Sequence, residues 1–512
     1  MTSQQQAITD DTQPGATGTS AAPTRRRGGW PRAALIGLLA VLLAVGGFLV
    51  WDRRQHPAVD SGAEVLPEGM ALYAELDVQP DLLQQAEMAR FAMTLRPARE
   101  VLTLTEKGDL REELWRGLAA GTRCAGVDYT QAVKPWLGRK VALALPDEQS
   151  APVWALQVTD EAQARDGAAK LAACGALPPD AAYRDGFLVL APGKGQATEL
   201  VDTGRDAPLS ADPRFVEDRK RVGRLGLFNF WGTKQGLIEL SEHPEVARRI
   251  GRQGGLVQRL GDEARAAGWR SAAGALRMIE GTPELKLVAK ADQPHKTSTT
   301  EMGMASLPQD TVLAVGISDG DQVVAEHWPE AQRLLTRLGA NPAPLAQRLK
   351  GTLPEDARTM LGKDFIVSFS PASGPVTSLA ELPMQVSTMA RSTKDADRVE
   401  ALVRRSGVSS DGYQPSRRKR TVVVSQDAER SKQVLRSRKR LTSDDGFRAA
   451  YATPEQGQIG LYANLARLGP VASDIAPTWL RPWLQDLEAV GVNAHNEDAN
   501  YSVAKLRVTP RR

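Results

Sequence analysis

Hydrophobic residues gather most densely near the start of the chain. From Ala33 to Val50, eighteen residues follow one another without a charged side chain. At a helical rise of about 1.5 Å per residue, this stretch spans about 27 Å, close to the roughly 30 Å of a bilayer's hydrocarbon core. Trp30 and Trp51 flank it, where amphipathic rings settle at membrane interfaces. The pattern predicts a transmembrane helix over residues 33–51, with the lipid bilayer as the partner of Ala33 to Val50.

Arginines are more numerous before this stretch than after it. Arg25, Arg26, Arg27 and Arg32 precede it, and Arg53 and Arg54 follow it. Because the more basic flank stays in the cytoplasm, we expect the amino terminus inside the cell and the rest of the chain outside. A cleavable secretory signal is the alternative, but it would have an apolar region of about 7 to 15 residues and a small-residue cleavage site. The stretch ends instead in Trp-Asp-Arg-Arg, which favours a retained anchor in the cell membrane.

Beyond the anchor, two series of similar elements follow one another. Leu66–Leu76 is echoed by Leu307–Ile317, and Trp136–Leu143 by Met360–Val367; each is a turn followed by a strand-like run. A larger unit comes next in each series: strand Val153–Val158 with a helix from Asp160 to Gly175, and strand Gln385–Met389 with a helix from Ser392 to Gly407. Asp and Ser are typical N-caps, and glycine is typical just past a helix end. The spacing predicts the same strand and helix in both series.

The later landmarks keep the same order in both series. They are the strands Phe187–Leu190 and Thr421–Val424, the turns Leu209–Phe215 and Leu441–Phe447, the runs Leu225–Asn229 and Ile459–Ala463, and the final strands Glu284–Ala289 and Ala499–Val508. From Asp160 to Phe228 the offset between the copies stays between 232 and 234 residues. This regularity favours an internal duplication over two unrelated domains. Between Gly232 and Met278 we expect a longer helical excursion, either a lid or helices that cover a sheet.

Strands that adjoin one another without strict alternation with helices are typical of α+β folds with mainly antiparallel sheets. The predicted organisation is a disordered cytoplasmic tail (1–32), the transmembrane helix (33–51), a linker (52–65), a first repeat (66–292), a second linker (293–306) and a second repeat (307–512). A doubly wound α/β fold fits the order of elements less well. In the repeats we therefore expect antiparallel sheets covered by helices.

Composition adds little about partners. The 42% of hydrophobic and 25% of charged residues are ordinary for globular proteins, and the net charge of +4 is split between the membrane flank and a nearly balanced remainder. The two cysteines, Cys124 and Cys174, both follow the anchor. Outside the cytoplasm they are free to oxidise, so the sequence predicts a disulfide between them, with two separate buried thiols as the alternative.

One segment is strongly basic. Between Ser416 and Arg440, ten cationic residues stand against two acidic ones, which gives +8, whereas the matching segment 184–208 of the first repeat carries −1. Packing therefore does not require the positive charge. The residues of a candidate anion-binding patch are Arg417, Arg418, Lys419, Arg420, Arg436, Arg438, Lys439 and Arg440. Anionic lipid or an acidic cell-wall polymer would be its partner, and a plain solvated face is the alternative. Nucleic acid is not expected, because aromatic residues for base stacking are missing.

Catalytic signatures are weak throughout. Lys194 lies between two glycines but lacks the earlier glycine and the following Ser or Thr of a phosphate-binding loop. Ser416 and Lys419 have the Ser-x-x-Lys spacing of penicillin-recognising enzymes, without the later Lys-Thr-Gly. The five histidines are scattered, and a tight metal site needs three or four convergent ligands. We therefore predict no catalytic, metal or cofactor site.

The chain resembles a known bacterial family. The features that carry the resemblance are the basic-flanked single span, the Leu-Pro turn that opens each copy, the Trp-Leu-Gly turn at Trp136 and the unit Gln157–Ala162. The family is common in high-GC Gram-positive bacteria and is catalogued only as a domain of unknown function. The resemblance covers Leu66 to the end, and it implies an anchored extracytoplasmic protein without supplying an activity or ligand.

These observations predict a membrane-anchored, extracytoplasmic binding or scaffolding module of the cell envelope, and not an enzyme. Two alternatives stay open. An envelope hydrolase would need a concave site with convergent titratable groups. A lipid carrier would need an apolar cavity within or between the copies.

Overall fold

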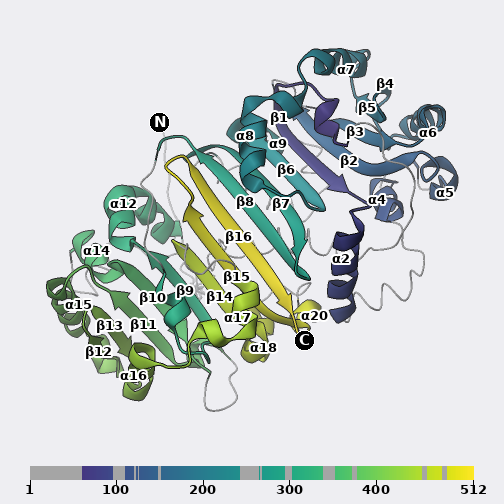
Figure 1. Ribbon diagram of the computed structural model, residues 1–512. Helices are drawn as coiled ribbons and strands as arrows, with labels where there is room; N and C mark the ends of the chain where they lie inside the picture. The colour runs from purple at the N-terminus through teal and green to yellow at the C-terminus, as the bar shows by residue number, and fades with distance from the viewer. Residues whose placement is uncertain are drawn as a thin grey trace, which may run out of the picture.

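The computed structural model describes residues 60–95, 110–119, 123–124, 126–147, 151–242, 265, 268–294, 302–337, 352–371, 378–451, 458–475 and 481–511. The first half below means residues 60–294 and the second half residues 302–511. In these residues the fold is α+β with an antiparallel sheet, as predicted. Instead of separate sheets, however, the strands form one sheet of 16 strands that crosses both halves (Figure 1).

The strands of the first half are β1 (Met70–Asp77), β2 (Leu137–Pro146), β3 (Val153–Val158), β4 (Asp180–Arg184), β5 (Phe187–Ala191), β6 (Phe228–Thr233), β7 (Trp269–Ile279) and β8 (Thr282–Ala291). Those of the second half are β9 (Leu313–Ser318), β10 (Asp364–Phe369), β11 (Met384–Met389), β12 (Gln414–Arg418), β13 (Thr421–Ser425), β14 (Ile459–Asn464), β15 (Leu487–Asn496) and β16 (Tyr501–Pro510). The sheet order is β12-β13-β11-β10-β9-β14-β15-β16-β8-β7-β6-β1-β2-β3-β5-β4. Both halves therefore have the same strand order, and they meet where β16 pairs with β8.

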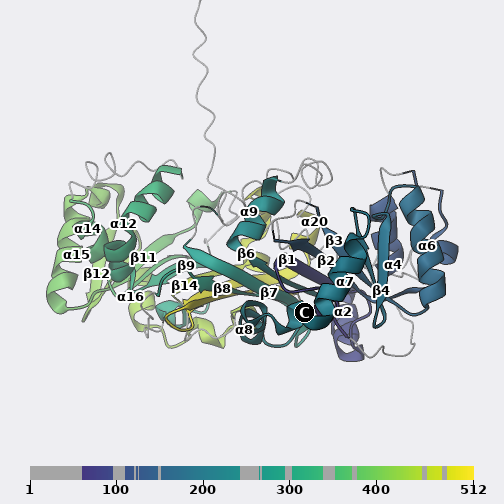
Figure 2. The same cartoon turned by 90° about the horizontal axis from the view of Figure 1, so that it is seen from above.

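The helices of the first half are η1 (Gly62–Glu64), α2 (Leu82–Thr94), α4 (Leu110–Ala119), α5 (Tyr129–Ala132), α6 (Glu161–Ala173), α7 (Gln196–Asp206), η2 (Leu209–Ala211), α8 (Pro213–Val222) and α9 (Lys234–Glu242). Those of the second half are η4 (Gly303–Ser306), α12 (Gly320–Arg337), α14 (Glu355–Leu361), η5 (Leu379–Glu381), α15 (Thr393–Arg405), η6 (Val408–Asp411), α16 (Ala428–Arg436), η7 (Leu441–Ser443), α17 (Asp445–Ala450), α18 (Leu465–Leu468), α19 (Pro470–Ile475) and α20 (Arg481–Leu484). The hydrophobic clusters place α7, α8, α16 and α17 on one face of the sheet and α4, α5, α6 and α15 on the other. Figure 2 shows α8 and α16 along one side of the sheet.

The predicted strand and helix unit is confirmed in both halves. The Asp160 side chain accepts a hydrogen bond from the Gln163 amide at the start of α6, and Ser392 accepts one from the Asp395 amide at the start of α15. Each helix is followed by a glycine with positive φ, 85° at Gly175 after α6 and 80° at Gly407 after α15. Side-chain caps satisfy amides that a helix start leaves without partners, so these short sequences fix the helix boundaries locally.

The seam between the halves differs on its two faces. On one face, Leu276 and Met278 of β7 pack with Leu506 and Val508 of β16 in one hydrophobic cluster. On the other face, the buried Asp218 of α8 accepts hydrogen bonds from Trp231 in its own half (2.8 Å) and from Tyr501 in the second half (2.9 Å). Burial and the neighbouring Asp218 raise the pKa of Tyr501, so its hydroxyl stays a donor. Apolar packing and a buried hydrogen bond therefore both join the two halves.

Two sequence predictions need correction or fall outside the described residues. The helical excursion expected between Gly232 and Met278 is wrong from residue 269 onwards, where β7 pairs with β6 and β8. Its alanines at 272, 273 and 275 have no strong strand preference, and only pairing on both sides makes this segment a strand. Among the described residues, no helix has the length and apolar character needed to cross a membrane, and Ala33 to Val50 lies outside them.

Candidate anion site at the centre of the sheet

Two lysines face each other where the halves meet. In the antiparallel pairing of β8 with β16, Lys286 lies opposite Lys505, and Glu284 lies opposite Arg507. Directly opposed residues of antiparallel strands project from the same face with their Cβ atoms about 4.5–5.5 Å apart. Like charges at this separation repel each other, so the centre of the sheet contains an electrostatically unfavourable pair.

Local sequence explains why these side chains share a face. In β8, Glu284 and Lys286 alternate with Leu285, which packs into the apolar cluster on the opposite side of the seam. The β7–β8 hairpin turns through Glu280 and Gly281, which both have positive φ (53° and 74°). Two such residues are typical of the tight turns that fix hairpin register. The alternation and the turn therefore set which residues of β8 reach this face.

Glu284 binds two arginines, one from each half. Arg277 donates to Glu284 Oε1 from Nε (3.0 Å) and Nη2 (2.6 Å), and Arg507 donates from Nε to Oε2 (2.8 Å). The Glu284 side chain is only 2% exposed. Burial acts to raise the pKa of Glu284, but the two arginines outweigh it and leave this pKa lowered. The carboxylate is therefore charged and neutralises part of the surrounding positive charge.

Both lysines have a lowered pKa. Lys286 Nζ donates to the carbonyl oxygen of Arg221 (2.6 Å), near the end of α8, where helix carbonyls lack helical partners. Burial, Arg277 and Lys505 lower the pKa of Lys286. Burial is also the first cause that lowers the pKa of Lys505. Arg507 and Arg277 lower it further, whereas Glu284 and Glu497 act to raise it. An anion near the lysines would oppose both shifts.

His495 of β15 lies beside the lysines. Burial first, and then Lys505, lower its pKa, which favours the neutral imidazole at neutral pH. Its Nδ1 is buried and has no hydrogen-bond partner among the described residues. We call Arg277, Lys286, Lys505 and Arg507, together with Glu284 and His495, the central basic cluster. The cluster thus contains four basic side chains and one carboxylate, and Glu497 also acts on its two lysines.

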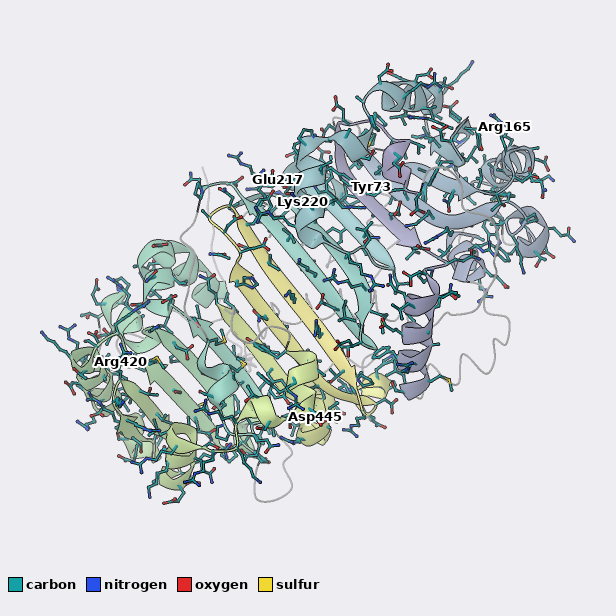
Figure 3. All side chains as sticks on the ribbon, in the orientation of Figure 1. Tyr73, Arg165, Glu217, Lys220, Arg420 and Asp445 are labelled. Carbon is teal, nitrogen blue, oxygen red and sulfur yellow. A yellow bond between two sulfur atoms is a disulfide. The ribbon has the colours of Figure 1, made fainter. Side chains whose placement is uncertain are left out.

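The central basic cluster is flanked by one helix from each half. α8 packs on β7 and β8, and α17 packs on β15 and β16. Both helices lie on the viewer's side in Figure 1, and β8 and β16 run between them. In Figure 3, Glu217 and Lys220 on α8 lie at one end of this strand pair, and Asp445 on α17 lies near the other. The cluster's cations are partly exposed, so a small anionic group can reach them.

The predicted basic patch lies far from this centre. Arg417 and Arg418 belong to β12, the outermost strand of the second half, and Arg420 lies at the outer edge of the molecule in Figure 3. Arg417 pairs with Asp397, Arg418 donates to the Leu435 carbonyl (2.9 Å) and Arg420 donates to the Arg391 carbonyl (2.9 Å). Much of this charge therefore binds the chain itself, and charged residues on an edge strand also discourage pairing with other chains.

The rest of the predicted patch follows α16. Arg436, Arg438, Lys439 and Arg440 are exposed. The contact between Arg418 and Leu435 brings this group next to the β12–β13 turn, where Lys419 has a positive φ of 54°. The structure therefore brings the two parts of the patch together, at the outer edge of the sheet.

Cys124 and Cys174 form a disulfide with their Cα atoms 5.2 Å apart. It links the end of α6 to the segment before α5, within the cluster that contains Trp115 and Trp136. The two cysteines are 50 residues apart in the sequence, so the disulfide closes a long loop. Its place in a hydrophobic cluster, away from the central basic cluster, makes it a structural crosslink of the first half.

Sequence reasoning missed the central basic cluster. Lys286 and Lys505 are 219 residues apart in the sequence, and neither lies in a basic run. A signal was present in the final strands of both copies, where charged residues alternate with apolar ones, as in Glu284-Leu285-Lys286 and Lys505-Leu506-Arg507. That pattern indicates a charged strand face, but it does not indicate that the two faces adjoin.

No known protein family matches this chain, and no curated protein or solved structure shows significant similarity to it. Within the described residues there is also no group of three or more His, Cys, Asp or Glu side chains that could hold a metal ion.

Proposed function

We propose that this protein is a membrane-anchored, extracytoplasmic binding module whose central basic cluster holds an anionic group of a cell-envelope component. The single observation that carries the proposal is the opposition of Lys286 and Lys505 across the seam. Burial is the first cause that lowers the pKa of both ammonium groups, and an anion that bridges them would oppose this shift. Arg277 and Arg507 are already fixed by Glu284 and would add to the local positive potential.

The anionic group is best described as a phosphate-type oxyanion. Lysines act as point charges for phosphate, whereas arginines provide a planar fork that suits bidentate contacts. The neutral His495 with an unpartnered Nδ1 would offer one further polar contact. Phosphate-type groups occur both in lipid head groups and in wall polymers, which are the partners that the sequence led us to expect.

The proposal includes the anchor and the duplication. Ala33 to Val50 would span the membrane and hold residues 52–512 outside the cytoplasm, where the oxidising environment suits the Cys124–Cys174 disulfide. The identical strand order of the two halves supports an origin by duplication. The resemblance to a family of anchored extracytoplasmic proteins agrees with this location and suggests no enzymatic activity.

The binding site can be tested on the full chain in nanodiscs of zwitterionic lipid. Pyrophosphate is titrated by calorimetry at low and high salt, using wild type and Lys286→Gln, Lys505→Gln and Arg165→Gln variants. Arg165 is the control, because its exposed side chain pairs with Glu161 at the far end of the first half (Figure 3). We expect each lysine variant to weaken binding about tenfold, which equals about 1.4 kcal/mol, and the control to have no effect.

The same titration separates the two basic surfaces. A variant with Gln at residues 436, 438, 439 and 440 removes the exposed part of the edge patch. If this variant loses binding while the lysine variants keep it, the ligand binds at the edge and the central site is rejected. Binding that is unchanged in high salt would reject an electrostatic site altogether. Two further titrants, vesicles that contain phosphatidylglycerol and a soluble polyphosphate, distinguish a lipid source from a polymer source.

A further inference from the structure

The second half contains a cavity of about 220 Å³ between α14, α15 and the strands β11 and β13. Its lining includes Asp356, Met360, Met384, Val386, Val403 and Ser406. The two smallest polar side chains are bound to the chain itself: Ser406 donates to the Val403 carbonyl (2.8 Å), and Asp356 accepts from the Thr352 amide (2.6 Å). The walls are therefore almost entirely apolar, and water would find few partners there.

The first half fills the matching place. Val386 of β11 pairs with Val367 and Val424, and in the same register Trp154 of β3 pairs with Leu143 and Leu190. Three further matching pairs are Trp136 and Met360, Leu171 and Val403, and Cys174 and Ser406. At each place the second half has the smaller side chain. The first half uses these larger groups in a continuous hydrophobic cluster.

Part of this difference is compensated within the second half. In the first half α6 lies so close to Trp136 that a Cβ on Gly167 would come within 2.2 Å of the indole Nε1. The matching helix α15 has Val399 at that position, so its bulk replaces some of the lost indole. Val386, which stands where the first half has Trp154, lines the cavity. We therefore attribute the cavity to the smaller side chain at this place, although Met384 and Tyr413 are larger than the matching Pro152 and Pro179.

We propose that this cavity binds a single acyl chain. An apolar cavity of about 150 Å³ suffices for benzene, and complete drug-sized ligands need about 300 Å³ or more, so one alkyl chain is the occupant that this volume and lining fit. Asp356 also pairs with Arg405 (3.1 Å), whose side chain is 50% exposed, so the polar end of the ligand would lie at this ion pair. The site is independent of the anion site proposed above.

The proposal is tested with the full chain in nanodiscs and a dodecanoic acid that carries a photoreactive diazirine at the chain end. After illumination, labelled peptides are located by mass spectrometry. We expect label on β11, on α15 or near Val408. Val386→Trp restores the indole that the first half has, and it should reduce this label about tenfold, which equals about 1.4 kcal/mol of binding free energy.

The control is Val216→Trp, at a 43% exposed position on α8, which should leave the label unchanged. If Val386→Trp does not fold, as judged by near-UV circular dichroism, Met384→Phe replaces it as the variant that narrows the cavity. Equal label at β11 and α15 in wild type and the filled variant would overturn the proposal, as would no label there at all. A phospholipid with the same diazirine on one chain distinguishes a lipid source from a free fatty acid.

Discussion

The two halves bury a carboxylate at matching places but surround it differently. In the first half Glu75 of β1 accepts from the Gly62 amide (3.0 Å) and binds Lys140 of β2 (3.1 Å). In the second half Gly316 stands where Glu75 is, and Asp364 of β10 stands where Lys140 is. Asp364 accepts from the Gly303 amide (3.0 Å). In both halves a glycine amide near the start of the half donates to the buried carboxylate, but the carboxylate lies on β1 in the first half and on β10 in the second.

This difference shifts the pKa values of the two carboxyl groups in opposite directions. Burial acts to raise the pKa of Glu75, but Lys140 and the hydrogen bonds from Tyr73, Ser61 and Gly62 outweigh it, so the pKa is lowered. Burial raises the pKa of Asp364 to about 7, although Gly303 and Ser318 donate hydrogen bonds to it. A shared backbone position thus accommodates a charged carboxylate in one half and a readily protonated one in the other. Lys140 is the largest of the causes that lower the pKa of Glu75, whereas burial dominates the pKa of Asp364.

Removing that cation should have the largest effect. Lys140→Met leaves Glu75 buried and unpaired, and breaking such a pair costs roughly 3–5 kcal/mol of unfolding free energy. Urea unfolding at pH 7 measures this loss. Lys170→Met is the control, since Lys170 is exposed and pairs with Asp166 on the helix surface, where a pair contributes about 0–1 kcal/mol. Similar losses in both variants would contradict the assigned role of Lys140.

Asp364 should make the second half less stable as pH rises. Because its pKa is raised on folding, the folded chain holds a proton that the unfolded chain loses above about pH 4. Its stabilising contribution is complete below that pH and is lost as pH rises to about 7. Raising the pKa of Asp364 to about 7 corresponds to about 4 kcal/mol. Glu75 acts oppositely: its contribution is present above about pH 4 and is lost as pH falls through its lowered pKa.

Asp364→Asn checks this sign. The amide mimics the protonated acid, so the variant should lack the decline between pH 4 and 7 and should be more stable than wild type at pH 8. Urea unfolding at several pH values provides the measurement. Parallel pH profiles for wild type and Asp364→Asn would show that another group causes the decline.

Loss of the disulfide should affect the first half alone. Cys124→Ser with Cys174→Ser opens a loop of 50 residues, and such a crosslink contributes roughly 2–4 kcal/mol. The second half has Ser406 where the first has Cys174, so reductant should leave its transition in place. Calorimetry with and without reductant separates the two transitions. If reductant leaves the thermogram unchanged, the disulfide does not stabilise the first half and this prediction is wrong.

The smallest effect is expected at the seam itself. Lys505→Gln removes one of two opposed like charges, which should raise the unfolding free energy by about 0.2–1 kcal/mol in the absence of anions. Excess pyrophosphate should reverse the order, since wild type would then bind the anion better. The measurement is urea unfolding at low salt with and without pyrophosphate. A variant that is less stable than wild type in both conditions would indicate a structural role for Lys505.

Much of the local structure could be predicted from the sequence because its causes are local. Asp160 and Ser392 cap α6 and α15, and glycines end both helices, so a few neighbouring residues set these boundaries. The pattern of the alanine-rich β7 is compatible with both helix and strand, and only its pairing with β6 and β8 makes it a strand. The edge patch was visible as a basic run, whereas its bonds to Asp397 and Leu435 were not.

The sequence by itself determined the strand and helix unit of each half, the repetition of landmarks in two series and the single pair of cysteines. Only the tertiary structure decided that β8 and β16 adjoin, that Lys286 therefore faces Lys505, and that the place filled by Trp154 in one half is hollow in the other. The reason is physical: caps, turns and alternation act over a few residues. Strand pairing and cavities depend on what residues far apart in the chain bring together.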